Sequence, residues 1–336
     1  MTKKTYIIAE AGVNHNGKLD LALKLCDAAK ESAVDAIKFQ TWKTELIISK
    51  NTEMAEYQKK NLQIEESQYD MLKKLELSYN DFKVIKKYCD DIGIQFLSTA
   101  DEPESLDFLC DLGMPFIKLG SGDINNVPFL RYTASKGLPI ILSTGMSNMK
   151  DVSFAYDILN NLKEAGVSDI SILHCTTNYP CPMNEVNLKA MLTIKEALKC
   201  KIGYSDHTLG VEVPVAAVAL GAEIIEKHFT LDKKMEGPDH SASLEPEELK
   251  DMVLKIRNIE QALGNGVKEP NESEKNISKV VLKVILAKTD IKKGEKLTEK
   301  NLIIKRAEQG LSAVYWDLIV GTEAKHDYKI DEPIRI

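Results

Sequence analysis

The sequence of 336 residues lacks the features that mark secreted, membrane and nucleic-acid-binding proteins. Its six cysteines show no CxxC spacing, which argues against a disulfide framework and a zinc ribbon. No stretch approaches the roughly 20 apolar residues of a membrane span, and no early run has the pattern of a secretion signal. Basic residues do not predominate, because the formal charge is −7. We therefore expect a cytoplasmic protein with neither a membrane nor a nucleic acid as its partner.

Aromatic residues are also scarce, at 6%, but 43% hydrophobic and 28% charged residues are ordinary for a soluble globular protein. Eight short apolar runs alternate with helical patterns over most of the chain. A parallel strand can return only through a crossover, usually a helix, so eight such rounds predict an α/β fold of the (β/α)8 TIM-barrel type. The runs begin at Tyr6, Ala36, Gln95, Phe116, Pro139, Ile170, Lys201 and Glu223.

The pattern changes after the last predicted barrel helix, about Pro246–Leu263. The following segment is polar and contains Pro270 and Asn271, which is typical of a linker. Short β-like runs then begin at Lys283. We predict a barrel in residues 1–266, a linker in 267–282 and a small domain in 283–336. Because so short a domain buries only a small core, we expect it to lean on its own barrel or on a neighbouring subunit.

Every predicted strand ends with a polar side chain. In a barrel of this type the carboxyl ends of the strands face one mouth, where active sites lie. In chain order the strand ends carry Glu10, Lys38 with Gln40, Thr99, Lys118 with Ser121 and Asp123, Ser143, Thr177 with Tyr179, Ser205 with His207, and His228. Polar groups at all eight ends argue against an inert barrel.

Two lysines, Lys38 and Lys118, lie inside otherwise apolar strands, where an unpaired lysine is costly. One interpretation is a salt bridge to Glu10 or Glu226. We favour a second, in which the two ammonium groups bind an anionic substrate. Nearby hydroxyl groups would extend this to a phosphate beside a lysine-bound carboxylate. These hydroxyls belong to Ser121, Ser143 and Ser205.

Two histidines, His207 and His228, end neighbouring strands and are expected to share one ion. A pair of imidazoles suits a divalent metal such as Mn²⁺, Co²⁺ or Zn²⁺, with substrate and water at the open positions. The alternative is that each is a hydrogen-bonded core histidine, but adjacency at the mouth favours the metal. Further candidates for the site are His15, His174 and His240.

Long motifs at these positions make the chain resemble the sialic acid synthase family, bacterial enzymes that condense phosphoenolpyruvate with N-acetylmannosamine or a close relative. The motifs are AEAGVNHNG (Ala9–Gly17), KFQT (Lys38–Thr41), KLGSGD (Lys118–Asp123), STGM (Ser143–Met146), HCTTNYP (His174–Pro180), YSDHT (Tyr204–Thr208), EKHFTLD (Glu226–Asp232) and GPDHSAS (Gly237–Ser243). The C-terminal part resembles the family's antifreeze-protein-like (SAF) domain. In the family this domain reaches across a domain-swapped homodimer into the partner's active site.

The resemblance implies a role for each matching residue. The catalytic candidates are Glu10, Lys38, Lys118 and Glu226, with Glu10 positioning a water. The phosphoenolpyruvate carboxylate would be held by Lys38, Thr99 and Lys118, and its phosphate by Ser121, Ser143, Thr177 and Ser205. The metal would be held by His207 and His228. The amino sugar would be faced by Gln40, Asn61, Asp123, Tyr179, Asp239 and Arg306, the last donated by the partner subunit.

The chain departs from the family pattern at a few positions. Ala100 and Asp101 stand where many members have Pro-Phe, and Ala307 stands where proline is usual. Asp123 replaces the glutamate of many members, and Thr177 stands where some carry asparagine. The departures at Ala100-Asp101 and at Ala307 bear on the identity of the sugar rather than on the reaction.

We therefore predict a metal-dependent transferase that forms a C–C bond between phosphoenolpyruvate and an N-acetylated amino sugar, gives a nine-carbon 2-keto sugar acid and releases phosphate. The acceptor would be N-acetylmannosamine or a 2,4-diacetamido-trideoxy hexose, and the metal Mn²⁺, with Mg²⁺ or Co²⁺ as alternatives. One rival interpretation is a Schiff-base aldolase using Lys38 or Lys118. Another is a non-catalytic sugar-binding protein whose small domain binds the sugar.

Overall fold

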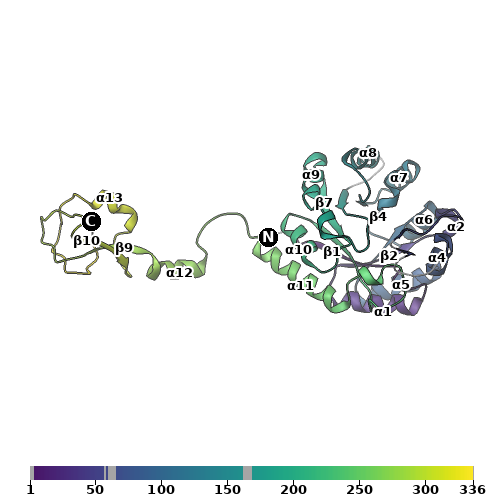
Figure 1. The fold of residues 1–336 in the computed structure, drawn as a ribbon, viewed down its shortest axis with the longest axis horizontal. Helices are drawn as coiled ribbons and strands as arrows, with labels where there is room; N and C mark the ends of the chain where they lie inside the picture. The colour runs from purple at the N-terminus through teal and green to yellow at the C-terminus, as the bar shows by residue number, and fades with distance from the viewer. Residues whose placement is uncertain (1–3, 57, 60–65, 162–168, 336) are drawn as a thin grey trace. The chain divides into compact units, whose positions relative to one another are not determined.

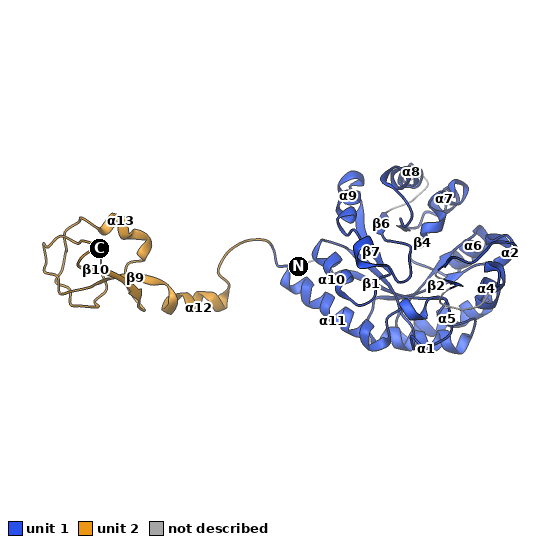
Figure 2. Ribbon diagram, in the orientation of Figure 1, with its two compact units in different colours: residues 1–265 blue, residues 266–336 orange. Residues whose placement is uncertain are grey.

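The computed structural model describes residues 4–56, 58–59, 66–161 and 169–335 (Figure 1). The chain divides into two compact units, Met1–Asn265 and Gly266–Ile336, which Figure 2 distinguishes by colour. None of the helices in the described ranges has the length and apolar character that a membrane crossing requires.

Eight parallel strands close into a barrel in the described part of the first unit, in the order of the chain (Figure 1). They are β1 (Tyr6–Gly12), β2 (Ala36–Thr41), β3 (Gln95–Ala100), β4 (Ile117–Leu119), β5 (Ile140–Ser143), β6 (Ile170–His174), β7 (Lys201–Asp206) and β8 (Ile224–His228). The barrel closes where β8 pairs with β1, placing Glu10 opposite His228. This closure confirms the predicted (β/α)8 architecture.

Helices connect the strands and surround the barrel (Figure 1). They are α1 (Leu19–Glu31), α2 (Thr44–Ile47), α4 (Gln68–Leu75), α5 (Tyr79–Ile92), α6 (Pro103–Asp111), α7 (Val127–Ala134), α8 (Met149–Asn160), α9 (Lys189–Leu198), α10 (Glu212–Ala219) and α11 (Pro246–Ala262), with the short 3₁₀ helices η1 (Ser121–Asp123), η3 (Met183–Glu185) and η4 (His240–Ala242). Local sequence explains the bounds of α5, because Ser78 and Asp81 form a capping box at its start. Gly93 ends α5 in the left-handed conformation, with φ of 73°.

The inward-facing side chains of the barrel change from apolar to polar toward the mouth. A buried apolar layer consists of Ile8, Ala36, Leu97, Ile141, Leu173 and Ile224. Two residues further along the chain from each of these stand Glu10, Lys38, Thr99, Ser143, Cys175 and Glu226. Because residues two apart in a strand share a face, the apolar layer forms a floor beneath these groups.

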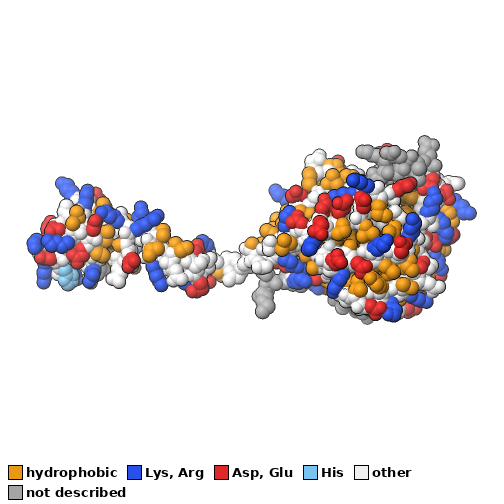
Figure 3. Space-filling view, turned by 90° about the horizontal axis from the view of Figure 1, so that it is seen from below, with side chains coloured by type: hydrophobic (Ala, Val, Ile, Leu, Met, Phe, Trp, Pro, Cys, Tyr) orange, Lys and Arg blue, Asp and Glu red, His pale blue; other side chains and the backbone are white. Residues whose placement is uncertain are grey.

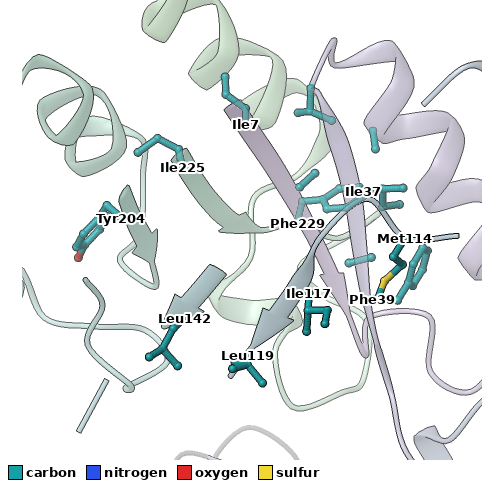
Figure 4. Close-up of a cluster of buried hydrophobic side chains, with 14 of the residues drawn as sticks. Ile7, Ile37, Phe39, Met114, Ile117, Leu119, Leu142, Tyr204, Ile225 and Phe229 are labelled. Carbon is teal, nitrogen blue, oxygen red and sulfur yellow. The ribbon is translucent and has the colours of Figure 1, made fainter. Parts of the chain in front are cut away.

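The outward-facing side chains pack against the surrounding helices in a larger apolar cluster. Figure 4 shows part of this cluster, including Ile37, Phe39, Ile225 and Phe229. The rings of Phe39 and Phe96 stack with centroids 6.0 Å apart. This packing holds the strands, and with them the side chains at their carboxyl ends, in a close-packed scaffold.

Acidic, basic and apolar side chains are intermixed on the face of the first unit that Figure 3 shows. No large area of one charge stands out on that face. Intermixed charges of opposite sign largely cancel at a distance from this face.

The second unit contains α12 (Glu272–Val281), β9 (Lys283–Ala287), β10 (Leu302–Arg306), η5 (Ala313–Tyr315) and α13 (Trp316–Ile319). The two strands pair antiparallel, and a small core around Ile285, Leu302 and Tyr328 stabilises the unit. The segment that the sequence predicts to be a linker contains α12. The polar composition of this segment is typical of a linker. A helix nevertheless begins there, because Asn271 and Glu274 form a capping box.

Candidate active site

A cavity of about 290 Å³ opens at the carboxyl ends of the barrel strands. Most of the residues predicted for the site line it. These are Glu10, Lys38, Gln40, Thr99, Lys118, Ser121, Ser143, Thr177, Tyr179, Ser205, His207, Glu226 and His228. Each stands at the end of a strand or in the loop that follows, so barrel closure brings together residues that are far apart in the sequence. Their individual roles stay predictions at this point.

A larger hollow of about 980 Å³ lies beside the cavity, lined in part by α8 and α9. It shares Met146, Cys175 and Thr177 with the cavity. The close lysine–glutamate contacts lie in the smaller cavity, which is where we look for chemistry.

The two buried lysines are ion-paired to two buried glutamates at the base of the cavity. Lys38 Nζ lies 2.6 Å from Glu10 Oε2 and 3.7 Å from Glu226 Oε2, and it donates a 2.8 Å hydrogen bond to Thr99 Oγ1. Lys118 Nζ lies 3.3 Å from Glu226 Oε1. The salt bridges that the sequence left as one interpretation are therefore present, and the same ammonium groups face the cavity.

The two glutamates have different proton affinities. Burial alone would raise the pKa of Glu226, but the ammonium groups of Lys118 and Lys38 outweigh burial and lower it to about 2. Burial raises the pKa of Glu10 to about 7, although Lys38 opposes this shift. A pair of carboxyl groups whose pKa values are driven apart is typical of acid–base sites. Glu10 therefore exchanges a proton near neutral pH, whereas Glu226 stays ionised.

Hydroxyl groups without partners face the same cavity. Within the described residues, Ser143 Oγ and Thr177 Oγ1 are buried and have no hydrogen-bond partner. Gly145 lies against Thr177, and a Cβ at this position would come within 1.9 Å of Thr177 Oγ1. Its N–H donates a 2.9 Å hydrogen bond to Ser121 Oγ. Because buried polar groups are usually satisfied, these hydroxyls indicate a bound ligand with acceptor oxygens.

The two histidines meet on the other side of the cavity, with ring centroids 5.5 Å apart. His207 Nδ1 lies 2.6 Å from the carbonyl oxygen of Thr176, which leaves its other nitrogen for a ligand. In the described part of the chain, the buried Nδ1 of His228 has no hydrogen-bond partner. Burial lowers the pKa of both imidazoles, so both are neutral at pH 7.

Neutral imidazoles with free nitrogens fit a divalent transition metal. Among the residues described, no group of three or more His, Cys, Asp or Glu side chains is arranged to hold an ion. A metal here would therefore take His207 and His228 as its protein ligands and fill its other positions with water and substrate.

Comparison with known protein families shows which family the chain belongs to. A model of the NeuB family matches residues 25–268, which is well over half of the chain. The chain belongs to the NeuB family. A model of the SAF domain matches residues 283–336, which confirms the predicted type of C-terminal domain.

Relatives of this NeuB-family chain span its whole length. It is 49% identical to N,N'-diacetyllegionaminic acid synthase of Campylobacter jejuni, over 99% of each chain. It is 46% identical to the protein of the same name from Legionella pneumophila, over 94% of this chain and 89% of the relative. A crystal structure of N-acetylneuraminic acid (sialic acid) synthetase from Leptospira borgpetersenii, in complex with citrate, matches with a TM-score of 0.72 and 35% identity, over 82% of this chain and 90% of that one. The resemblance to sialic acid synthases is thereby confirmed.

Two of the residues predicted to face the sugar, Asp123 and Asp239, do not line the cavity of this NeuB-family chain. Asp123 lies in η1, where Asn126 Nδ2 donates a 3.2 Å hydrogen bond to its Oδ1. Asp239 Oδ2 lies 4.0 Å from His228 Nδ1. Arg306 is an exposed residue at the end of β10 in the second unit. Asn61 lies outside the described residues.

The other candidate histidines do not join the site. His15 Nδ1 accepts the N–H of Gly17, and His240 Nδ1 lies 2.6 Å from Thr230 Oγ1. His174 Nε2 lies 2.9 Å from the carbonyl oxygen of Val186. Each of the three has a hydrogen-bond partner, and none of them lines the cavity.

Asp101 lines the cavity, although sequence reasoning noted it only as a departure from the family pattern. Burial, with a further contribution from Asp123, raises the pKa of Asp101 to about 7. The signal that could have found it is its place directly after a strand, two residues beyond Thr99. A desolvated carboxyl group at this edge is suited to accept hydrogen bonds from the donors of a substrate.

Asp101→Asn is expected to stabilise the protein at pH 8 more than at pH 5. The pKa of Asp101 is raised from its ordinary 3.8 to about 7, so the folded protein at pH 8 must hold an ionised, desolvated carboxylate that asparagine replaces. At pH 5 the folded protein already holds the neutral acid. Urea unfolding at both pH values measures the difference.

Asp107→Asn is the matched control for this measurement. Hydrogen bonds from Lys136 and Tyr132 lower the pKa of Asp107, so its ionised form stabilises the fold and the variant should lose stability at both pH values. An equal effect of Asp101→Asn at pH 5 and pH 8 would contradict the assignment of a raised pKa.

Proposed function

We propose that this chain condenses phosphoenolpyruvate with a 2,4-diacetamido-trideoxy hexose, forming a nine-carbon 2-keto sugar acid of the legionaminic acid type and releasing phosphate. The observation that carries the proposal is one cavity in which two buried ammonium groups and unpartnered hydroxyls stand opposite a pair of neutral imidazoles. The names of the relatives at 49% and 46% identity support the choice of acceptor over N-acetylmannosamine.

The charged side of the cavity suits phosphoenolpyruvate. Lys38, Thr99 and Lys118 would hold its carboxylate, because their donors lie together at the base of the cavity. The phosphate would take hydroxyl donors that line the cavity, which are Ser121, Ser143, Thr177 and Ser205. Among the described residues, the hydroxyls of Ser143 and Thr177 have no partner, whereas that of Ser205 now donates to Glu226 at 3.0 Å. A bound anion would share the ammonium groups that now pair with glutamates.

The reaction needs a nucleophilic carbon, an activated aldehyde and a water. C3 of phosphoenolpyruvate attacks the aldehyde carbon of the open-chain sugar, water adds at C2, and the tetrahedral intermediate collapses with release of phosphate. Glu10, with a pKa of about 7, would accept the proton of that water. Glu226 stays ionised and keeps Lys38 and Lys118 in place. A divalent cation held by His207 and His228, with Mn²⁺ as our first choice, would supply Lewis-acid activation of the aldehyde.

The Schiff-base alternative is disfavoured by the ion pairs. An amine must lose its proton before it can attack a carbonyl group. Burial alone would lower the pKa of Lys38, but Glu10 and Glu226 outweigh burial and raise it. Lys38 therefore stays an ammonium group, suited to binding an anion.

The deciding experiment measures phosphate release from phosphoenolpyruvate with each acceptor sugar in turn. We expect kcat/KM to be at least about 10-fold higher with the diacetamido sugar, because a site built for an extra amide leaves polar groups unpaired when the amide is absent. Equal or better use of N-acetylmannosamine would reassign the acceptor. Absence of phosphate release with both sugars, together with a borohydride-trapped pyruvyl adduct, would replace the reaction by the aldolase.

We also propose a cytoplasmic homodimer in which Arg306 completes the partner's sugar site. Arg306→Ala should raise KM for the sugar by about 10- to 100-fold, the effect of losing a charge-assisted hydrogen bond, and should leave KM for phosphoenolpyruvate nearly unchanged. The neighbouring Lys305→Ala is the control, because Lys305 pairs with Asp331 of its own unit at 2.5 Å.

Mixed dimers test whether the arginine acts across subunits. A barrel mutant, His207→Ala, and the Arg306→Ala variant should each be impaired alone. After subunit exchange, their hybrid would contain one site with both native groups, so activity should exceed the sum of the separate activities. Activity no greater than that sum would show that Arg306 does not act in the partner's site.

A further inference from the structure

Lys227 is a buried lysine that the proposed reaction does not use. It lies in β8 between Glu226 and His228, which line the cavity, and it points to the opposite side of the strand. On that side its neighbours along the strand are Ile225 and Phe229, both members of the apolar cluster in Figure 4. Only 1% of Lys227 is exposed. An ammonium group in such a layer is costly and calls for an explanation.

The Lys227 ammonium binds both residues that flank His207. Its Nζ lies 2.5 Å from Asp206 Oδ2, and both side chains are fully buried. It also donates a hydrogen bond to the carbonyl oxygen of Thr208. Asp206 Oδ1 in turn accepts hydrogen bonds from Thr208, at 3.2 Å from its N–H and 3.0 Å from its hydroxyl. The three residues close a ring of bonds around the backbone of His207.

This ring of bonds lies at the point where the backbone pairing of β7 with β8 ends. The pairing between β7 and β8 ends at Asp206 and Lys227, so His207 lies beyond the last strand pair. The loop after β6 also contacts His207: Cys181 N–H donates to its carbonyl oxygen at 2.7 Å, and Thr176 O lies 2.6 Å from its Nδ1. Lys227 therefore fixes the backbone around His207 to β8, next to His228.

Stability alone does not account for the ion pair. Replacing a buried ion pair by apolar side chains of similar volume is often neutral or stabilising, so the charges add little to stability as such. Their geometric effect is specific, because it fixes the segment that carries one histidine to the residue beside the other.

We propose that Lys227 is a positioning residue that holds His207 at the spacing from His228 needed for one shared divalent cation. The inference rests on the proposed function, in which the two imidazoles bind that cation. Lys227 touches neither substrate nor metal and acts through the backbone of residues 206–208. Partners outside the first ligand set of a metal typically change its affinity about 10- to 100-fold.

The test compares Mn²⁺ binding by the full-length wild type and Lys227→Met, measured by electron paramagnetic resonance of free Mn²⁺. We expect the variant to bind Mn²⁺ about 10- to 100-fold more weakly. Phosphoenolpyruvate binding without metal should be unchanged, and kcat at saturating Mn²⁺ should approach that of the wild type. Lys233→Met is the matched control, because Lys233, in the loop after β8, pairs with Glu248 of α11 rather than with Asp206.

A second variant separates positioning from folding. Lys227→Met leaves the buried Asp206 carboxylate unpaired, whereas Asp206→Asn combined with Lys227→Met removes both charges. The double variant should regain thermal stability but not Mn²⁺ affinity, because the carbonyl of Thr208 remains unheld. Recovery of both Mn²⁺ affinity and stability in the double variant would overturn the positioning role of Lys227 but not the metal assignment. Wild-type Mn²⁺ affinity in Lys227→Met would have the same consequence. Failure of the wild-type chain to bind Mn²⁺ would overturn the metal assignment and this inference with it.

Discussion

Replacing Lys118 by methionine is expected to lower kcat/KM for phosphoenolpyruvate by about 10²- to 10³-fold, because removing one partner of a buried charge pair costs about 2–5 kcal/mol. Lys118 is 3% exposed and lies 3.3 Å from Glu226, inside a strand that is otherwise apolar. Methionine has a similar volume, so it removes the ammonium without opening a large cavity.

Two losses combine in this variant. The substrate anion loses a positive partner, and Glu226 loses the first of the cations that lower its pKa. The pKa of Glu226 should therefore rise, and the pH dependence of kcat/KM should shift with it. Steady-state kinetics from pH 5 to pH 9 would record both effects.

Lys136→Met is the control for Lys118→Met. Lys136 belongs to the same barrel, but it pairs with Asp107 at 2.5 Å away from the cavity. It should change kcat/KM little. Retention of phosphoenolpyruvate affinity in Lys118→Met would show that the ammonium serves only Glu226, which is the salt-bridge interpretation in its strict form.

His207→Ala is expected to abolish divalent-cation binding and to reduce phosphate release by about 10³-fold or more, because Lewis-acid activation of a carbonyl is worth several kcal/mol. A single remaining imidazole, His228, cannot replace the pair, since no described group of three or more ligating side chains is available at the site. Mn²⁺ binding and phosphate release should be measured in parallel, before and after treatment with a chelator.

His174→Ala provides the matched histidine control. His174 ends the neighbouring strand β6, but its Nε2 lies 2.9 Å from the carbonyl oxygen of Val186 and it does not line the cavity. Its loss should leave Mn²⁺ affinity unaffected. Turnover by His207→Ala at the wild-type rate after chelation would exclude the histidine pair as the metal site.

The sequence by itself determined the architecture of the barrel. The alternation of side chains within strands and the helical spacing of apolar residues between strands involve residues only a few positions apart. Eight strands and their polar ends could therefore be predicted from the amino-acid sequence. The long motifs then indicated the family, because several of them occur in the right order. Both kinds of information are local in the chain, and neither requires knowing which strands meet.

Only the tertiary structure decided which polar groups form ion pairs and hydrogen bonds with one another. Barrel closure pairs Lys38 with Glu10 and Lys118 with Glu226, and it drives the pKa values of the two glutamates in opposite directions. It also brings Asp101 into the cavity, whereas Asp123 does not line the cavity and accepts a hydrogen bond from Asn126. Such outcomes depend on the register of distant strands and on loop conformation, which spacing along the chain does not encode.

The bond ring of Lys227, Asp206 and Thr208 shows the same division. In the sequence, Lys227 is one letter between two predicted site residues, and strand alternation indicates that it faces away from them. The ammonium of Lys227 binds both neighbours of His207 because β7 and β8, which α10 connects, pack side by side. The sequence alone does not show this contact. The sequence determined which faces the side chains take, because alternation is local. The tertiary structure decided their partners, because hydrogen bonds and ion pairs depend on distances between segments that only the closed barrel sets.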